Sequence, residues 1–193
     1  MIYLIGGVPR SGKSQFSKQL AQKLNIARID FDDITTAFEA VVPEYGLFMT
    51  MDQDIHQQKA CPIVESLIKL YLKRNEDLII EGDNFGLQDW LKYKEMCKDN
   101  LKMCVFGYSD ITPQQKIEIN TETTADQICW FEPLNIPEKI RIAQEMIDRS
   151  KKMRVEVDEI NDLNHIKYFE THPNFENTLE EAMRFCLEDR KPN

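Results

Sequence analysis

The sequence has few glycine and proline residues, no long apolar run and no excess of positive charge. Seven glycines and eight prolines among 193 residues exclude a fibrous or low-complexity chain. The longest apolar runs, such as residues 78–80, are far shorter than the roughly 20 residues that span a bilayer. The first residues also lack the basic segment, apolar segment and small-residue cleavage site of a secretory signal. We therefore expect a cytoplasmic protein with no membrane partner.

Basic residues are outnumbered, since 24 Lys and Arg against 33 Asp and Glu give a net charge of −9. A surface of this sign repels phosphate backbones, so we expect no nucleic-acid partner. The five cysteines form no CxxC pair, which argues against a structural zinc site or a disulfide framework. With 42% hydrophobic and 30% charged residues, the composition is that of one globular domain, and it carries no signal for an oligomeric state.

Short apolar runs alternate along the chain with segments of helical periodicity. We predict strands at residues 2–5, 27–31, 77–82, 101–108 and 165–169. We predict helices at residues 13–24, from 32 onward, from Asp52 or Pro62 to Arg74, at 87–97, from 113 onward, at 137–160 and at 179–187. Asp32 or Asp33 is expected to cap the second helix. The alternation predicts an α/β fold with a parallel sheet and right-handed crossovers.

A phosphate-binding motif follows the first predicted strand and opens the first helix. The segment GVPRSGKS matches G-x-x-x-x-G-K-[ST], in which glycines let several backbone N–H groups converge on one anion. In this motif the lysine bridges the β- and γ-phosphates, and the hydroxyl that follows it completes a Mg²⁺ shell. Arg10 either reaches a phosphate or lies in solvent. We assign nucleotide binding to Gly7, Val8, Pro9, Arg10, Ser11, Gly12, Lys13 and Ser14, and metal binding to Ser14.

An acidic residue ends the third predicted strand, as in a Walker B element. If this strand neighbours the first, Glu81 lies beside Ser14 and can hold Mg²⁺ through a water molecule. Asp83 is a second candidate, for the metal or for the substrate. The alternative is that both are helix-capping or loop carboxylates.

Three further carboxylates follow the second predicted strand, at the edge where open parallel sheets place their sites. We expect one acid to cap the next helix and another to face the γ-phosphate and accept a proton from a substrate hydroxyl. We favour Asp32 as this base and assign Asp32 and Asp33 to the substrate site. Asp30 and Asp33 are the alternatives for the base.

These motifs together resemble the small P-loop kinases, which include adenylate, shikimate and gluconate kinases and chloramphenicol phosphotransferase. The resemblance implies a three-layer P-loop NTPase fold with a five-stranded parallel sheet in the order 2-3-1-4-5. It implies ATP with Mg²⁺ and a single kinase domain over residues 1–193. An acceptor-binding helical segment would lie at about 32–74 and a lid at about 121–137. In this superfamily an Asp after the second strand contacts substrate or acts as the base, which falls on Asp32 or Asp33.

The predicted lid departs from the superfamily, because it contains no Lys or Arg where lids usually carry arginines to the ATP phosphates. The basic residues come later, on the long helix over 137–160. Arg154 lies on the apolar stripe of this helix and is either at the edge of the stripe or directed at phosphate. We assign Arg154 to catalysis and Arg149 to nucleotide binding, with Lys151 as an alternative.

The function predicted from these residues is transfer of the ATP γ-phosphoryl group to the hydroxyl of a small acceptor. The alternatives are a nucleotide-binding switch or NTPase, although no N/T-K-x-D guanine motif occurs, and a kinase with a macromolecular acceptor. Residues 31–66 contain seven Asp or Glu and one Lys, a net charge of −6, and no Arg lies between Arg28 and Arg74. We therefore expect a neutral or cationic acceptor, such as a nucleoside, sugar, amino sugar or amino alcohol, over a nucleoside monophosphate.

Overall fold

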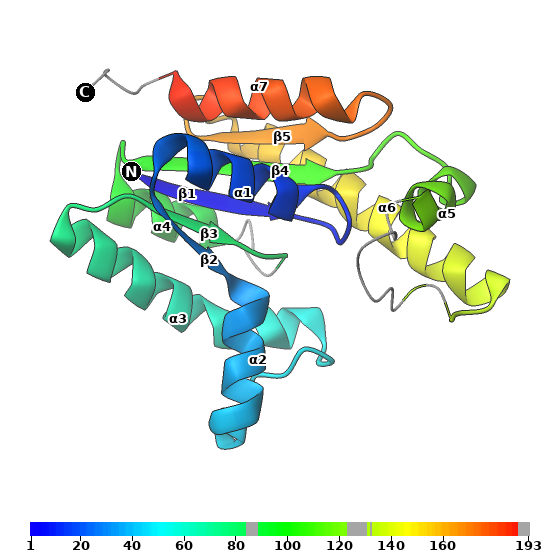
Figure 1. Ribbon diagram of the computed structural model, residues 1–193, viewed down its shortest axis with the longest axis horizontal. Helices are drawn as coiled ribbons and strands as arrows, with labels where there is room; N and C mark the ends of the chain where they lie inside the picture. The colour runs from blue at the N-terminus through cyan, green and yellow to red at the C-terminus, as the bar shows by residue number, and fades with distance from the viewer. Residues whose placement is uncertain (84–88, 123–130, 132, 189–193) are drawn as a thin grey trace.

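A computed structural model describes residues 1–83, 89–122, 131 and 133–188 of the chain. In these residues five parallel strands form one sheet in the order β2-β3-β1-β4-β5 (Figure 1). This order confirms the fold predicted from the sequence. The strands are β1 (Ile2–Gly7), β2 (Ala27–Asp30), β3 (Leu78–Glu81), β4 (Leu101–Gly107) and β5 (Ile166–Glu170).

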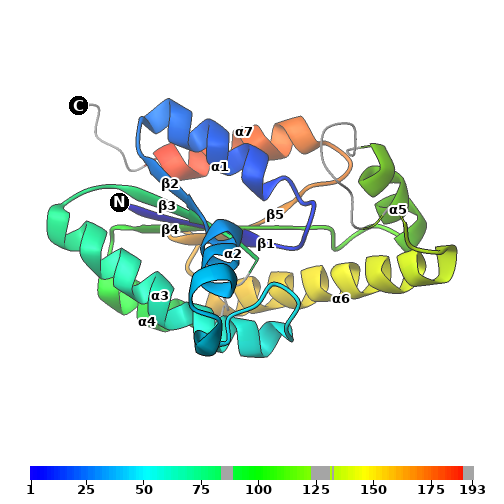
Figure 2. The ribbon, with the colours of Figure 1, turned by 60° about the horizontal axis from the view of Figure 1, so that its bottom comes forward.

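Helices cover both faces of the sheet and give the molecule three layers. One face packs against α1 (Lys13–Leu24) and α7 (Phe175–Leu187). The other packs against α3 (Gln53–Arg74), α4 (Trp90–Cys97) and α6 (Ile136–Ile160), as Figure 2 shows. Successive side chains of a strand point to opposite faces, so the central strand β1 contributes to both cores. Ile2 and Leu4 belong to one core, and Tyr3 and Ile5 belong to the other.

The remaining helices follow the carboxyl ends of two strands. Helix α2 (Phe31–Val41) follows β2 directly and leads through a short 3₁₀ turn, η1 (Pro43–Tyr45), toward α3. Helix α5 (Pro113–Glu122) follows β4 and contacts α6. None of the helices in the described residues is both long and apolar enough to cross a membrane.

The structure settles how three of the predicted helices begin. Asp30 caps α2 by accepting a hydrogen bond from the backbone N–H of Asp32, so the prediction that Asp32 or Asp33 is the cap was wrong. Helix α3 begins at Gln53 behind the capping residue Asp52, which confirms the first of its two predicted starts, and Pro62 lies inside it. Helix α7 includes the predicted residues 179–187 and begins earlier, at Phe175, because Asn174 supplies its cap.

Candidate active site

The phosphate loop connects β1 to α1 at the carboxyl edge of the sheet. Gly7 has φ +133° and Gly12 has φ +86°, backbone conformations that residues with a side chain rarely adopt. A Cβ atom would overlap the Phe106 backbone at Gly7 and the Phe175 ring at Gly12. Both glycines of the motif are therefore required by the backbone path and its close neighbours.

Lys13 is the first residue of α1 and lies almost fully buried within the loop. Its Nζ donates a hydrogen bond to the carbonyl oxygen of Val8 at 2.9 Å, so the ammonium lies across the concave side of the loop. The N-terminal backbone N–H groups of α1 have no intrahelical partner and carry the positive end of the helix dipole. The loop therefore combines a fixed cation with backbone donors, which is the chemistry of a polyphosphate cradle.

A second lysine, which the sequence analysis missed, lies against this loop. Lys116 of α5 is fully buried, and its Nζ lies 3.3 Å from the carbonyl oxygen of Pro9 and 3.4 Å from that of Arg10. The same Nζ also lies 3.5 Å from the ring centroid of Tyr108, whose hydroxyl donates to the Arg10 carbonyl. Helix α5 thus fixes the phosphate loop from outside, and the Arg10 guanidinium donates to the carbonyl of Asn120 on the same helix.

Lys116 should make folding stability depend on pH. Burial, with the charges of Lys13 and Arg10, lowers the pKa of Lys116 to about 6, whereas in the unfolded chain it keeps a pKa of about 10.4. Between these values the unfolded state binds a proton that the folded state lacks, so stability increases with pH by about 1.4 kcal/mol per unit. Denaturant titrations between about pH 6.5 and 8 should show this slope in the wild type and its loss in Lys116→Met.

The matched control for this experiment is Lys18→Met, on the exposed side of α1. We expect this variant to keep the slope of the wild type, since the Lys18 side chain is exposed to solvent in the folded protein and removing it leaves Lys116 buried. Parallel stability curves for the wild type and Lys116→Met would contradict a neutral buried Lys116.

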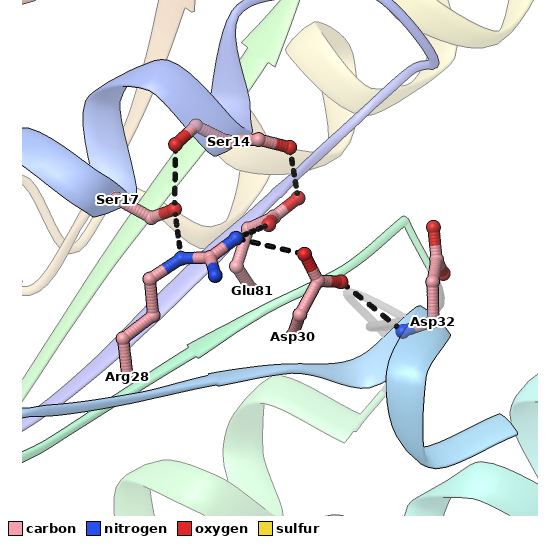
Figure 3. Close-up of polar contacts among 6 residues, drawn as sticks. All are labelled: Ser14, Ser17, Arg28, Asp30, Asp32 and Glu81. Atoms are coloured by element: carbon pink, nitrogen blue, oxygen red, sulfur yellow. Dashed lines mark hydrogen bonds and ion pairs between the residues drawn. The ribbon is translucent and has the colours of Figure 1, made fainter. Parts of the chain in front are cut away.

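Glu81 and Ser14 meet where β3 pairs with β1. The strand register sets Glu81 opposite Ile5, and the Ser14 hydroxyl donates to Oε1 of Glu81 at 3.2 Å (Figure 3). The expectation that Glu81 lies beside Ser14 is therefore confirmed. Glu81 is 3% exposed, and burial together with Asp30 raises its pKa, while Lys13 and Arg28 act in the opposite direction.

Arg28 of β2 holds this carboxylate in place. Its Nη2 lies 2.6 Å from Oε2 of Glu81 and 2.8 Å from Oδ2 of Asp30, and its Nε donates to the Ser17 hydroxyl at 2.7 Å (Figure 3). Arg28 therefore joins β2, β3 and α1 through one guanidinium. The sequence analysis assigned this residue no role in the site, although Arg28 and Asp30, two apart on a strand, share one face and can pair.

The Ser14 and Glu81 oxygens fit the requirements of Mg²⁺. Both are hard oxygen ligands, and their 3.2 Å separation is near the roughly 2.9 Å between adjacent oxygens of an octahedral Mg²⁺ shell. The described residues hold no cluster of three His, Cys, Asp or Glu side chains suited to a metal ion. A magnesium ion here would accordingly take most of its ligands from water and phosphate, as is usual for this ion. The metal role of Glu81 stays a prediction.

Asp32 lies in a cavity next to this carboxylate group. The cavity has a volume of about 230 Å³ and is lined by Asp32, Met49, Met51, Gln53, His56 and Asp83. Partial desolvation, with the Asp83 and Asp30 carboxylates, raises the pKa of Asp32 to about 6, and Lys13 acts in the opposite direction. Asp32 and Asp33 are both exposed to solvent, and of the two only Asp32 lines the cavity. Among the three acids after β2, Asp30 is engaged by Arg28, which leaves Asp32 as the carboxylate within the cavity.

The structure pairs Arg149 with Asp83, a residue of the cavity lining, and gives Arg154 a different partner. Arg149 donates to the backbone carbonyl of Asp83 and lies 3.9 Å from its carboxylate. Arg154 is 45% exposed and pairs with Asp110 at 2.7 Å, with a hydrogen bond to Ser109. The nucleotide role of Arg149 and the catalytic role of Arg154 stay predictions.

The predicted lid over residues 121–137 falls largely outside the described residues, since 123–130 and 132 are not among them. Helix α5 extends to Glu122 and α6 begins at Ile136, with a capping box between Asn135 and Glu138. Both ends of the predicted segment therefore join helices that adjoin the site, α5 at the phosphate loop and α6 through Arg149.

A five-stranded parallel sheet in this order, with a phosphate loop after its first strand, gives the chain the fold of the P-loop small-molecule kinases. The solved structures that resemble it include a gluconokinase from Sinorhizobium meliloti 1021, at a TM-score of 0.58 and 12% identity over 96% of this chain and 91% of that one. They also include shikimate kinases.

One shikimate kinase is that of Acinetobacter baumannii, solved in complex with shikimate, at a TM-score of 0.55 and 15% identity over 99% of this chain and 94% of that one. Another, from Bacteroides thetaiotaomicron, has a TM-score of 0.56 and 12% identity over 97% of this chain and 98% of that one. No model of a known protein family and no curated protein matches the sequence. At these identities the likeness establishes the fold, and the activity has to be argued from the site.

Proposed function

We propose that this protein is a kinase that transfers the γ-phosphoryl group of ATP to a hydroxyl group of a small molecule. The observation that carries the proposal is the position of Asp32. This carboxylate lines a cavity of about 230 Å³ and lies close enough to Lys13 for the ammonium charge to affect its pKa. One site therefore contains both a carboxylate that can accept a proton and an ammonium group that can bind phosphate.

In the proposed reaction the acceptor occupies the cavity and ATP occupies the phosphate loop. The acceptor hydroxyl oxygen forms a bond to the γ-phosphorus, the bond from that phosphorus to the β–γ bridging oxygen breaks, and ADP leaves with the bonding electrons. Asp32 accepts the hydroxyl proton, for which a pKa of about 6 suits neutral pH. Lys13 and the loop N–H groups stabilise negative charge on the phosphates. Bound Mg²⁺, held by Ser14 and by Glu81, would supply further charge neutralisation.

The size and position of the cavity favour a small acceptor over a macromolecular one. Ligand pockets for drug-sized molecules measure about 300 to 1,000 Å³, so this cavity suits a compound of monosaccharide size or smaller. Its lining comes from the first turn of α2, the segment before α3, the first turns of α3 and Asp83, which follows β3. These residues support the assignment of segment 32–74 to acceptor binding.

The proposal is tested by following ADP release and phosphoester formation with ³¹P NMR, in the presence of ATP, Mg²⁺ and a panel of hydroxyl compounds. We expect one chemical class of acceptor to give a new phosphoester signal. Hydrolysis of ATP to inorganic phosphate at a rate independent of every acceptor would instead support an NTPase and contradict the kinase.

A further inference from the structure

The acceptor cavity contains a histidine with no role in the phosphoryl-transfer chemistry. His56 lies on the first turns of α3, is 4% exposed and lines the cavity together with Asp32 and Asp83. Its ring lies edge-on to Phe31, at 6.4 Å between centroids, so α2 and α3 fix its orientation together. A buried imidazole in a binding cavity is a polar group that has to be satisfied by protein, water or ligand.

The hydrogen bonds around His56 favour one tautomer. The Thr35 hydroxyl lies 3.1 Å from the carbonyl oxygen of Phe31, to which it can donate its one proton. Nε2 of His56 lies 3.2 Å from the same hydroxyl oxygen, which then has lone pairs to offer. We infer from this arrangement that Nε2 carries the ring proton. Burial lowers the pKa of His56, although Asp83 acts in the opposite direction, so the ring stays neutral and Nδ1 is left unprotonated.

Nδ1 of His56 is a hydrogen-bond acceptor that the protein does not use. It is buried and has no hydrogen-bond partner within the described part of the chain. A buried acceptor without a partner is destabilising, and the penalty is removed when a ligand supplies an N–H or O–H group. Among the described lining residues, the Asp32 and Asp83 carboxylates are also acceptors, and the Gln53 amide nitrogen uses one of its two N–H groups for the Asp83 carbonyl at 3.2 Å.

The charge of the cavity selects against anions. Among the described residues that line the cavity, the charged ones are acids and none is Lys or Arg. Arg149, which contacts the lining residue Asp83, is already engaged by the carboxylate and carbonyl of that residue, and Lys13 belongs to the phosphate loop. A carboxylate or phosphate on the acceptor would lie beside Asp32 with no cation free to pair with it.

We propose that His56 is a specificity-determining residue whose unprotonated Nδ1 accepts a hydrogen bond from the phosphoryl acceptor. The acceptor class is then a small uncharged or cationic compound with several hydroxyl or ammonium donors, a sugar, an amino sugar or an amino alcohol. Asp32 and Asp83 bind further donors of the same molecule, and Met49 and Met51 contact its carbon skeleton. This assignment of the acceptor class rests on the proposed kinase function, whereas the state of His56 does not.

The first experiment measures the tautomer directly by ¹⁵N NMR of the free protein. The sequence has three histidines, so the His56 signals are assigned by their absence from the spectrum of His56→Gln. We expect Nε2 protonated and Nδ1 unprotonated at neutral pH, with the change to the charged form at a pH below the ordinary histidine range, because burial lowers the pKa of His56. A protonated Nδ1 would overturn the proposal whether or not the protein is a kinase.

The second experiment titrates the same protein with glucose, glucosamine and ethanolamine, and with the anions gluconate, shikimate and AMP. We expect Nδ1 of His56 to shift with at least one member of the first group and with none of the second. Shifts confined to the anions, or no shift with any compound, would overturn the acceptor class.

Two variants separate the contribution of Nδ1 from that of the fold. A Gln side chain reaches the position of Nε2 and an Asn side chain that of Nδ1, so His56→Gln keeps the Thr35 contact and His56→Asn keeps an acceptor at the Nδ1 position. With the acceptor identified by titration, we expect its KM to increase about tenfold in His56→Gln and to stay close to the wild-type value in His56→Asn. We expect the affinity for MgATP to be unchanged in both variants. Equal KM values in the two variants would contradict recognition through Nδ1. Phosphorylation confined to the anions would leave the kinase intact and refute the inference alone.

Discussion

Replacement of Lys13 by Ala is expected to reduce the affinity for MgATP by about 100-fold. The Lys13 ammonium lies across the phosphate loop, 2.9 Å from the carbonyl oxygen of Val8, where it can move to the β- and γ-phosphates. A hydrogen bond to a charged group contributes about 1.5 to 3 kcal/mol, and each 1.4 kcal/mol corresponds to a factor of ten in affinity. Isothermal titration calorimetry with a non-hydrolysable ATP analogue and Mg²⁺ measures the effect.

The control is Lys18→Ala, which removes a lysine from the exposed side of the same helix and leaves the net charge of the two variants equal. We expect Lys18→Ala to bind the analogue like the wild type. Circular dichroism should show equal helix content in both variants, because Lys13 is the first residue of α1 and Ala is compatible with that position. Unchanged affinity in Lys13→Ala would mean that the loop does not bind phosphate through this residue.

The fold could be predicted from the sequence because its strands are short apolar runs that end in glycine or acidic residues. Ile2–Gly7 and Leu78–Glu81 are buried on both faces of the sheet, so both appear as continuous apolar runs. The position of Glu81 beside Ser14 then follows from the pairing of two neighbouring parallel strands. The capping residue of α2 could not be predicted in the same way, because three nearby acids all have the side chain of an N-cap.

The residues of the site that could not be predicted are those fixed by tertiary contacts. Arg28 lies on a short strand, and its pairing with Glu81 depends on the register of β2 with β3. Lys116 belongs to a mostly polar helix, and only the packing of α5 against the phosphate loop buries it. His56 becomes a candidate binding residue only when α2 brings Thr35 to its Nε2. No periodic pattern or motif spacing in the sequence predicts any of these contacts.

Replacement of Asp32 by Asn is expected to decrease turnover by about 100-fold or more and to leave the affinity for MgATP nearly unchanged. An Asn side chain has almost the same shape as Asp, but it cannot accept the hydroxyl proton, and loss of a general base has an effect of about 10² to 10⁴. The cavity places Asp32 on the acceptor side of the site, which is why the nucleotide affinity should not change.

The pH dependence of kcat/KM distinguishes a base from a residue that only positions the acceptor. With a pKa of about 6 in the free enzyme, Asp32 becomes protonated below that pH, and kcat/KM of the wild type should then decrease about tenfold per pH unit. Asp32→Asn should lose this decrease along with most of its activity. The matched control is Asp33→Asn, the exposed neighbour in the same helical turn, which should keep both the rate and the pH profile of the wild type. If Asp33→Asn loses activity and Asp32→Asn keeps it, the base is Asp33 and the cavity at Asp32 serves acceptor binding alone.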